Sequence, residues 1–161
     1  MRAVSNTSPL SNLAIIGRLD LLKQRYEVVR IPPTVAAELS RLSHVAGKAR
    51  ITAALAKGWL IVEEPAVTPP QPEFPLDPGE REAIALARAV QADVLLIDEK
   101  RGRAVARRAG LTVAGVLGEL LHAKLSGRLP ALRPELQRLR SEAGFFIDAE
   151  IEEFILSQAG E

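Results

Sequence analysis

Short apolar runs alternate along the chain with longer segments in which apolar residues recur at helical spacing. The runs lack the strict alternation of a half-buried strand, so they are typical of strands covered on both faces of a parallel sheet. A first strand begins at Ala3 and stops at a polar cluster, and further strands are expected at 28–31, 59–62, 94–97 and 111–114. The pattern predicts an α/β fold of right-handed crossover units, a parallel sheet between layers of helices.

The first helix is expected to begin at Pro9 with Ser8 as its N-cap, and Gly17 is expected to divide it. The prolines between residues 65 and 78 indicate an extended surface connection that is too short to separate two domains, so residues 1–161 are expected to form a single domain. Further helices are expected from about residue 34, at 49–57, from about 77, at 99–109 and, filling the C-terminal third, at 115–126, 134–142 and 148–158.

Asn6 directly follows the first predicted strand and faces the start of a helix. Open α/β sheets build their binding sites where strands end and helices begin, so Asn6 is a candidate site residue. Glu38, Glu80 and Asp98 lie where the crossover geometry can gather them beside it. Clustered carboxylates repel one another and call for a cation, and hard oxygen ligands select Mg²⁺ or Mn²⁺. Such an ion activates water for phosphodiester hydrolysis.

Each acid also has a simpler interpretation. Asp77 and Glu80 match the capping box, and Glu38 fits an exposed helix acid. Glu82 is an alternative ligand to Glu80. Asp98 is harder to explain otherwise, because it terminates a buried strand. The hypothesis of a metal site depends on the order and placement of the three acids together and not on any one of them.

The helix at 99–109 is basic, and Arg101, Arg103 and Arg107 are candidates for holding an RNA backbone. A solvated helix face with cations near its C-terminus explains them equally well.

Composition narrows the class of protein. The chain has no cysteine, which excludes disulfides and zinc–thiolate sites, and its net charge of +1 does not by itself indicate nucleic-acid binding. We find no cleavable leader pattern and no apolar run of membrane-spanning length, so a cytoplasmic protein without membrane contact is expected. No P-loop, dinucleotide-binding turn or nucleophile elbow is present.

A series of motifs resembles the PIN-domain family, in particular a prokaryotic branch related to VapC toxins. In order they are 5–10 with 12–14, 31–33 with 38–39, 76–80, 83–87, 95–99 with 102–103, and 115–118 with 123–124. The resemblance implies a PIN-like three-layer α/β/α fold. It also implies a Mg²⁺- or Mn²⁺-dependent endoribonuclease with metal ligands at Asn6, Glu38, Glu80 and Asp98, and often a homodimer held by an antitoxin protein.

One position departs from the family. Its first acid is normally aspartate, and this chain has Asn6, whose amide can coordinate a metal but brings no charge. The substitution is natural and weakens the site, or was engineered to disable a toxin, or is tolerated because the other acids suffice. The alternative to a nuclease is a catalytically inactive PIN fold that binds RNA or a protein.

Overall fold

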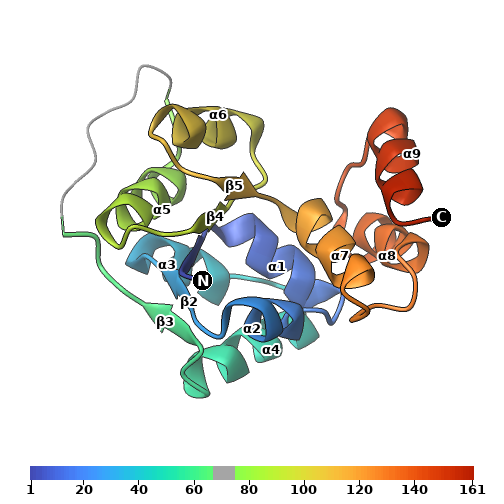
Figure 1. Cartoon of the computed structure of the whole chain (residues 1–161). Coiled ribbons are helices and arrows are strands. Elements are labelled where there is room, and N and C mark those ends of the chain that lie inside the picture. Colours follow the sequence, from blue (N-terminus) through green and yellow to red (C-terminus); the bar gives the residue numbers. More distant parts are fainter. Residues whose placement is uncertain (67–74) are drawn as a thin grey trace.

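Five parallel strands form one sheet in the computed structural model, which describes residues 1–66 and 75–161 (Figure 1). The spatial order is β3-β2-β1-β4-β5, so β1 pairs with β2 on one side and with β4 on the other. The strands are β1 (Ala3–Ser5), β2 (Val29–Ile31), β3 (Leu60–Val62), β4 (Val94–Leu96) and β5 (Val113–Ala114). The predicted parallel α/β sheet is confirmed.

Successive residues of the central strands point into two separate cores. Val4, Leu95 and Ile97 pack with α5 (Pro78–Ala89) and α6 (Lys100–Arg108) on one face of the sheet. Ala3, Val94 and Leu96 belong to the larger core on the other face. The helices of that core are α1 (Thr7–Ile15), α2 (Asp20–Tyr26), α3 (Pro33–Ser40), α4 (Val45–Ala56), α7 (Val116–Leu125), α8 (Arg133–Ala143) and α9 (Ala149–Gln158). The three-layer arrangement and the helical C-terminal third are therefore confirmed.

The C-terminal helices form a lobe beside the sheet. Figure 1 shows α6 above the sheet, α2 and α4 below it, and α7 leading away to α8 and α9. Helix α9 is the outermost element of this lobe (Figure 1). No helix of the described ranges has both the length and the apolar character needed to cross a bilayer.

Two helix starts differ from the sequence prediction. Helix α1 begins at Thr7 with Asn6 as its N-cap residue, so the prediction that Ser8 caps it was wrong. The Ser8 hydroxyl instead donates to Asp98 at 3.0 Å, a tertiary bond that no local pattern reveals. Helix α4 begins at Val45 rather than at 49, because His44 Nδ1 accepts the backbone N–H of Gly47 at 2.9 Å and caps the helix.

The predicted break between the first two helices lies at Gly17. Gly17 has φ of +74°, a conformation that suits glycine, and it lies between α1 and α2 as predicted. Of the proline-containing connection, residues 67–74 lie outside the described part of the chain.

The buried carboxylate of Glu119 links α7, at the start of the C-terminal lobe, to α2 beside the sheet. Glu119 of α7 is 3% exposed, and Arg25 Nη1 of α2 donates to both of its oxygens at 3.0 Å. The Tyr26 hydroxyl donates to the same carboxylate at 2.6 Å, and burial together with Glu119 raises the pKa of Tyr26. Removing one partner of such a group leaves the others buried without a bond, which costs more than the bond itself contributes.

We therefore expect Glu119→Gln to lower the free energy of unfolding by about 1–3 kcal/mol. Glu142→Gln is the matched control, because Glu142 pairs with Arg138 at the surface at 3.3 Å. An exposed pair of this kind contributes at most about 0.5 kcal/mol. Urea unfolding of both variants measures the difference, and equal losses would contradict a locking role for Glu119.

Candidate functional site

Asn6 lies at the point where the strand order of the sheet reverses. Its backbone N–H donates to the carbonyl of Leu96 at 2.9 Å, which places it beside the end of β4 and close to Asp98. Asn6 is 4% exposed, and its Oδ1 has no hydrogen-bond partner within the described ranges. A buried amide oxygen without a donor is unfavourable, and it identifies a place where a ligand would be stabilising.

The first turn of α1 contacts two of the predicted acids. Thr7 Oγ1 donates to Glu38 Oε2 of α3, and Ser8 Oγ donates to Asp98 Oδ2 at 3.0 Å. Asn12, one turn further along α1, donates from Nδ2 to Ser8 Oγ at 3.1 Å. Two neighbouring hydroxyls therefore hold carboxylates that are far apart in the sequence.

Asp98 is held from two sides. Its Oδ1 accepts the backbone N–H of Val116, the first residue of α7, at 2.8 Å. Burial raises the pKa of Asp98, and the bonds from Val116 and Ser8 and the charge of Arg103 oppose that shift. The ionised side chain is thus stabilised by the N-terminus of one helix and the first turn of another.

Glu80 takes part in the capping box of α5 and also has a buried, unpaired oxygen. Its backbone N–H donates to Asp77 Oδ1 at 2.8 Å and its Oε1 accepts from the Asp77 N–H at 3.3 Å, so the predicted capping box is confirmed. The residue is only 6% exposed, and Oε2 is buried with no partner in the described chain. Burial, with a further contribution from Asp77, raises the pKa of Glu80 to about 7. Glu82 is half-buried on the same helix and shows no such orphaned oxygen.

Each predicted acid lies against a glycine. A methyl group on Gly79 would lie 2.7 Å from Glu38 Oε1, and one on Gly115 would lie 2.6 Å from Asp98 Oδ1. A methyl group on Gly102 would overlap Glu80 Oε2. Since Gly79 neighbours Glu80, these contacts and those of α1 connect Asn6, Glu38, Glu80 and Asp98 into one region at the end of the sheet.

The donor chemistry of this region fits a hard divalent cation. All four candidate side chains offer oxygen, and the orphaned Asn6 Oδ1 and Glu80 Oε2 are unused acceptors. The acids do not converge on one point, however: in the described ranges, no three Asp, Glu, His or Cys side chains are grouped closely enough to hold a metal ion. A cation bound by three of the candidate acids would compete with Thr7 and Ser8 for Glu38 and Asp98. Their role as metal ligands stays a prediction.

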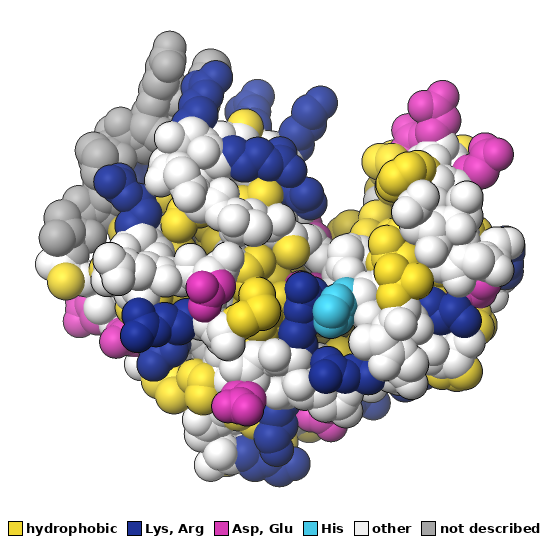
Figure 2. Space-filling view, in the orientation of Figure 1, with side chains coloured by type: hydrophobic (Ala, Val, Ile, Leu, Met, Phe, Trp, Pro, Cys, Tyr) yellow, Lys and Arg dark blue, Asp and Glu magenta, His cyan; other side chains and the backbone are white. Residues whose placement is uncertain are grey.

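The three candidate arginines occupy different positions on α6. Arg103 is half-buried beside Asp98, since its Nη1 lies 2.9 Å from the same point above Gly115 that Asp98 approaches. Arg101 and Arg107 are exposed. Figure 2 shows Lys and Arg side chains gathered over α6. A role in RNA binding stays a prediction for all three.

Several residues of this region were not predicted. Ser8 was considered as a helix cap and Thr7 only as part of the first motif, and Glu99, whose charge raises the pKa of both Glu80 and Asp98, was not considered as a site residue. Gly79, Gly102 and Gly115 lie within the motifs that resemble the PIN-domain family. This was the one signal in the sequence that these glycines approach acids closely.

Comparisons with known proteins agree with this architecture. The family model DUF3368, described as a PIN domain, matches residues 2–161. The solved structure of the PilT N-terminus domain protein SSO1118 from the hyperthermophilic archaeon Sulfolobus solfataricus P2 superposes with a TM-score of 0.55 at 22% identity. That match covers 81% of this chain and 95% of the archaeal one, and at this identity the likeness concerns the fold alone. None of the curated proteins matches the chain.

The glycine beside Asp98 gives a test of packing at the site. Gly115 has extended backbone angles, φ −126° and ψ −178°, that alanine also adopts, so the effect of Gly115→Ala comes from the collision of the new methyl group with Asp98 and Arg103. We expect a loss of about 1–3 kcal/mol in the free energy of unfolding. Gly118→Ala is the control, because nothing lies within 4 Å of a methyl group there and alanine favours the helix by up to about 1 kcal/mol. Equal stability of the two variants in urea unfolding would contradict close packing.

The raised pKa of Glu80 predicts a pH dependence of stability. Between its ordinary value of 4.5 and about 7 the folded chain keeps a proton at Glu80 that the unfolded chain releases. The folded state therefore binds more protons, and the free energy of unfolding falls as the pH rises through this range. We expect Glu80→Gln to flatten that slope in urea unfolding at a series of pH values. Glu82→Gln is the control, because it also removes one acid from α5. An equal flattening of the slope in that variant would contradict the assignment of the pH dependence to Glu80.

Proposed function

The chain belongs to the PIN-domain family, whose fold is generally that of a nuclease, and from this premise we propose that it is a Mg²⁺- or Mn²⁺-dependent endoribonuclease of the VapC toxin type. The observation that supports the proposal is that the first turn of α1 bonds Glu38 and Asp98 next to Asn6, while Asn6 Oδ1 and Glu80 Oε2 are buried and unpaired.

In this proposal Glu38, Glu80 and Asp98 bind the cation, with the Asn6 amide as an uncharged fourth ligand. A divalent cation held by these residues would supply Lewis-acid activation of water for hydrolysis of the phosphodiester. Thr7 and Ser8 hold two of the acids in place, through the bonds to Glu38 Oε2 and Asp98 Oδ2. Arg103, beside Asp98, neutralises part of the negative charge of the site.

Binding of RNA is assigned to α6, which borders the site through Gly102 and Arg103. Arg101 and Arg107 are exposed and suit the geometry of backbone phosphates. As a toxin-type nuclease, the chain would act on RNA in the cytoplasm and be restrained by an antitoxin protein.

Asn6 limits the proposed activity. A charge about 4 Å from another contributes on the order of 4 kcal/mol at an effective dielectric constant of ~20, so the missing carboxylate weakens attraction for a divalent ion. This absence, together with the lack of a three-acid group in the described chain, favours a second candidate function. In that alternative the domain binds RNA or a protein through α6 and hydrolyses nothing.

Restoring the acid separates the two functions. We expect Asn6→Asp to bind Mn²⁺ at least about tenfold more tightly in isothermal titration calorimetry, because the new carboxylate adds an attractive charge. We also expect it to cleave a mixed RNA pool faster than the unaltered chain does.

The control is the double variant Asn6→Asp with Asp98→Asn, which has the net charge of the unaltered chain but lacks an acid of the site. We expect it to cleave no faster than the unaltered chain. Cleavage only by Asn6→Asp identifies a nuclease weakened at one ligand. RNA binding without Mn²⁺ uptake or cleavage in any of the chains would contradict the nuclease and favour the binding module.

A further inference from the structure

The first turn of α7 orients Asp98. Asp98 Oδ1 accepts the backbone N–H of Val116, the first residue of α7, at 2.8 Å. The first N–H groups of a helix have no partner within the helix, so this N–H has no competing acceptor in α7. Gly115 lies directly before it, and a methyl group there would be 2.6 Å from the same oxygen. A shift or rotation of α7 therefore moves the donor that holds Asp98.

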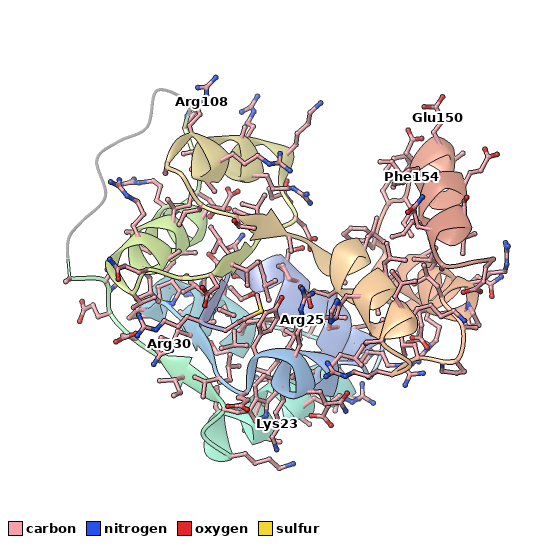
Figure 3. The ribbon with its side chains drawn as sticks, viewed as in Figure 1. Lys23, Arg25, Arg30, Arg108, Glu150 and Phe154 are labelled. Atoms are coloured by element: carbon pink, nitrogen blue, oxygen red, sulfur yellow. The ribbon has the colours of Figure 1, made fainter. Side chains whose placement is uncertain are left out.

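Glu119 anchors the same turn of α7 from outside the helix. Its backbone N–H donates to the carbonyl of Gly115 at 3.1 Å, so the residue belongs to the first turn. Its buried carboxylate accepts Arg25 Nη1 on both oxygens at 3.0 Å and the Tyr26 hydroxyl at 2.6 Å. Figure 3 shows Arg25 between α2 and α7. Three bonds to one carboxylate fix the rotation of this turn and its position along the helix axis.

The donors to Glu119 are joined closely to the sheet. Arg25 and Tyr26 are the last two residues of α2, and β2 begins at Val29. Strand β2 pairs with β1, which leads directly to Asn6. The guanidinium of Arg25 also lies over the ring of Tyr26, 5.1 Å from its centroid, and this contact holds the two donors together. The bonds of Glu119 therefore fix α7 relative to the strand that positions Asn6.

We propose that Glu119 is a positioning residue for Asp98, because its bonds to Arg25 and Tyr26 hold α7 where the Val116 N–H meets the Asp98 carboxylate. This role needs no bound ion. Its consequence for the site rests on the proposed function, in which Asp98 binds a divalent cation. Partners that orient a metal ligand from outside the coordination sphere raise the affinity for the metal. Glu119 acts through Val116 and does not itself bind the ion.

A role in stability alone does not explain the choice of a charged group at this position. Apolar residues of similar volume often stabilise a fold as well as a buried ion pair does, because removing charges from water is costly. A buried ion pair differs from apolar contacts in that its bonds are directional. Directional bonds are what a helix needs if one N–H at its start must meet one carboxylate.

The chain offers a matched control in Glu135 of α8. Glu135 is also 3% exposed, and it accepts Arg18 Nε at 3.0 Å and Arg18 Nη2 at 2.6 Å. Arg18 lies between α1 and α2, so this pair joins α8 to that connection and not α7 to the sheet. Glu119→Gln and Glu135→Gln each remove one buried carboxylate and leave one arginine without it. They differ in whether the lost bonds hold the first turn of α7.

Amide hydrogen exchange of Val116, followed by NMR, tests the positioning role without any metal. We expect Glu119→Gln to accelerate exchange of this N–H at least about tenfold more than Glu135→Gln does, because the bond to Asp98 is weakened only in the first variant. Both variants also destabilise the whole fold, and the comparison between them removes that contribution. Tyr26→Phe keeps the ring and the pair between Glu119 and Arg25 but lacks one bond, so it is expected to accelerate the exchange of Val116 as well.

Mn²⁺ affinity tests the consequence for the site. Isothermal titration calorimetry is performed on Asn6→Asp, and on Asn6→Asp combined with either Glu119→Gln or Glu135→Gln. We expect the affinity to fall about tenfold with Glu119→Gln, as it does when a partner that orients a ligand is lost. With Glu135→Gln we expect it to stay unchanged.

Two outcomes would overturn the proposal. Equal acceleration of Val116 exchange in Glu119→Gln and Glu135→Gln would show that Glu119 acts on stability alone. Faster exchange of Val116 in Glu119→Gln, with an Mn²⁺ affinity that the same substitution leaves unchanged, would show that the bond from α7 does not position Asp98 for an ion. If no chain bound Mn²⁺, the proposed nuclease would be contradicted, and the exchange of Val116 would still decide whether Glu119 positions Asp98.

Discussion

The site depends on the first turn of α1, where two adjacent hydroxyls reach carboxylates from opposite sides. Thr7 donates to Glu38 and Ser8 donates to Asp98, so residues from α3 and from the end of β4 are fixed relative to β1. This turn follows the strand directly at the point where the strand order reverses. The parallel sheet therefore determines where the acids meet, and the hydroxyls determine how each of them points.

Hydrogen bonds from backbone N–H groups offset the cost of burying the carboxylates of Glu80 and Asp98. The Glu80 carboxylate accepts the N–H of Asp77, the N-cap residue of α5, and Asp98 accepts the first N–H of α7, so both carboxylates lie at helix N-termini. The glycines at 79, 102 and 115 allow backbone to approach the carboxylates without a side chain between them. The compensation is incomplete, because Asn6 Oδ1 and Glu80 Oε2 stay unpaired. Local rules broken in this way are typical of functional sites.

The elements of the fold followed from short-range patterns, whereas the contacts of the site did not. The buried strand before Asp98 and the capping box at Asp77 and Glu80 were predicted correctly, because a few neighbouring residues determine each. The N-cap at Ser8 was predicted wrongly, because a bond to Asp98, 90 residues away, takes up its hydroxyl. The contact between Thr7 and Glu38 depends on the rotation of α3 against α1, which the sequence pattern does not specify.

Asn6 changes the balance between the stability of the fold and the proposed capacity to bind an ion. A carboxylate at this position would lie beside the end of β4, near Asp98, in a region where burial already raises the pKa of Asp98 and Glu80. The additional repulsion would raise those pKa values further and destabilise the fold unless a cation were bound. The uncharged amide avoids that repulsion, and it removes part of the attraction that would draw a divalent ion in. Asparagine at position 6 therefore favours the stability of the fold over the proposed attraction for a divalent ion, and the unpaired Asn6 Oδ1 is the unfavourable feature that remains.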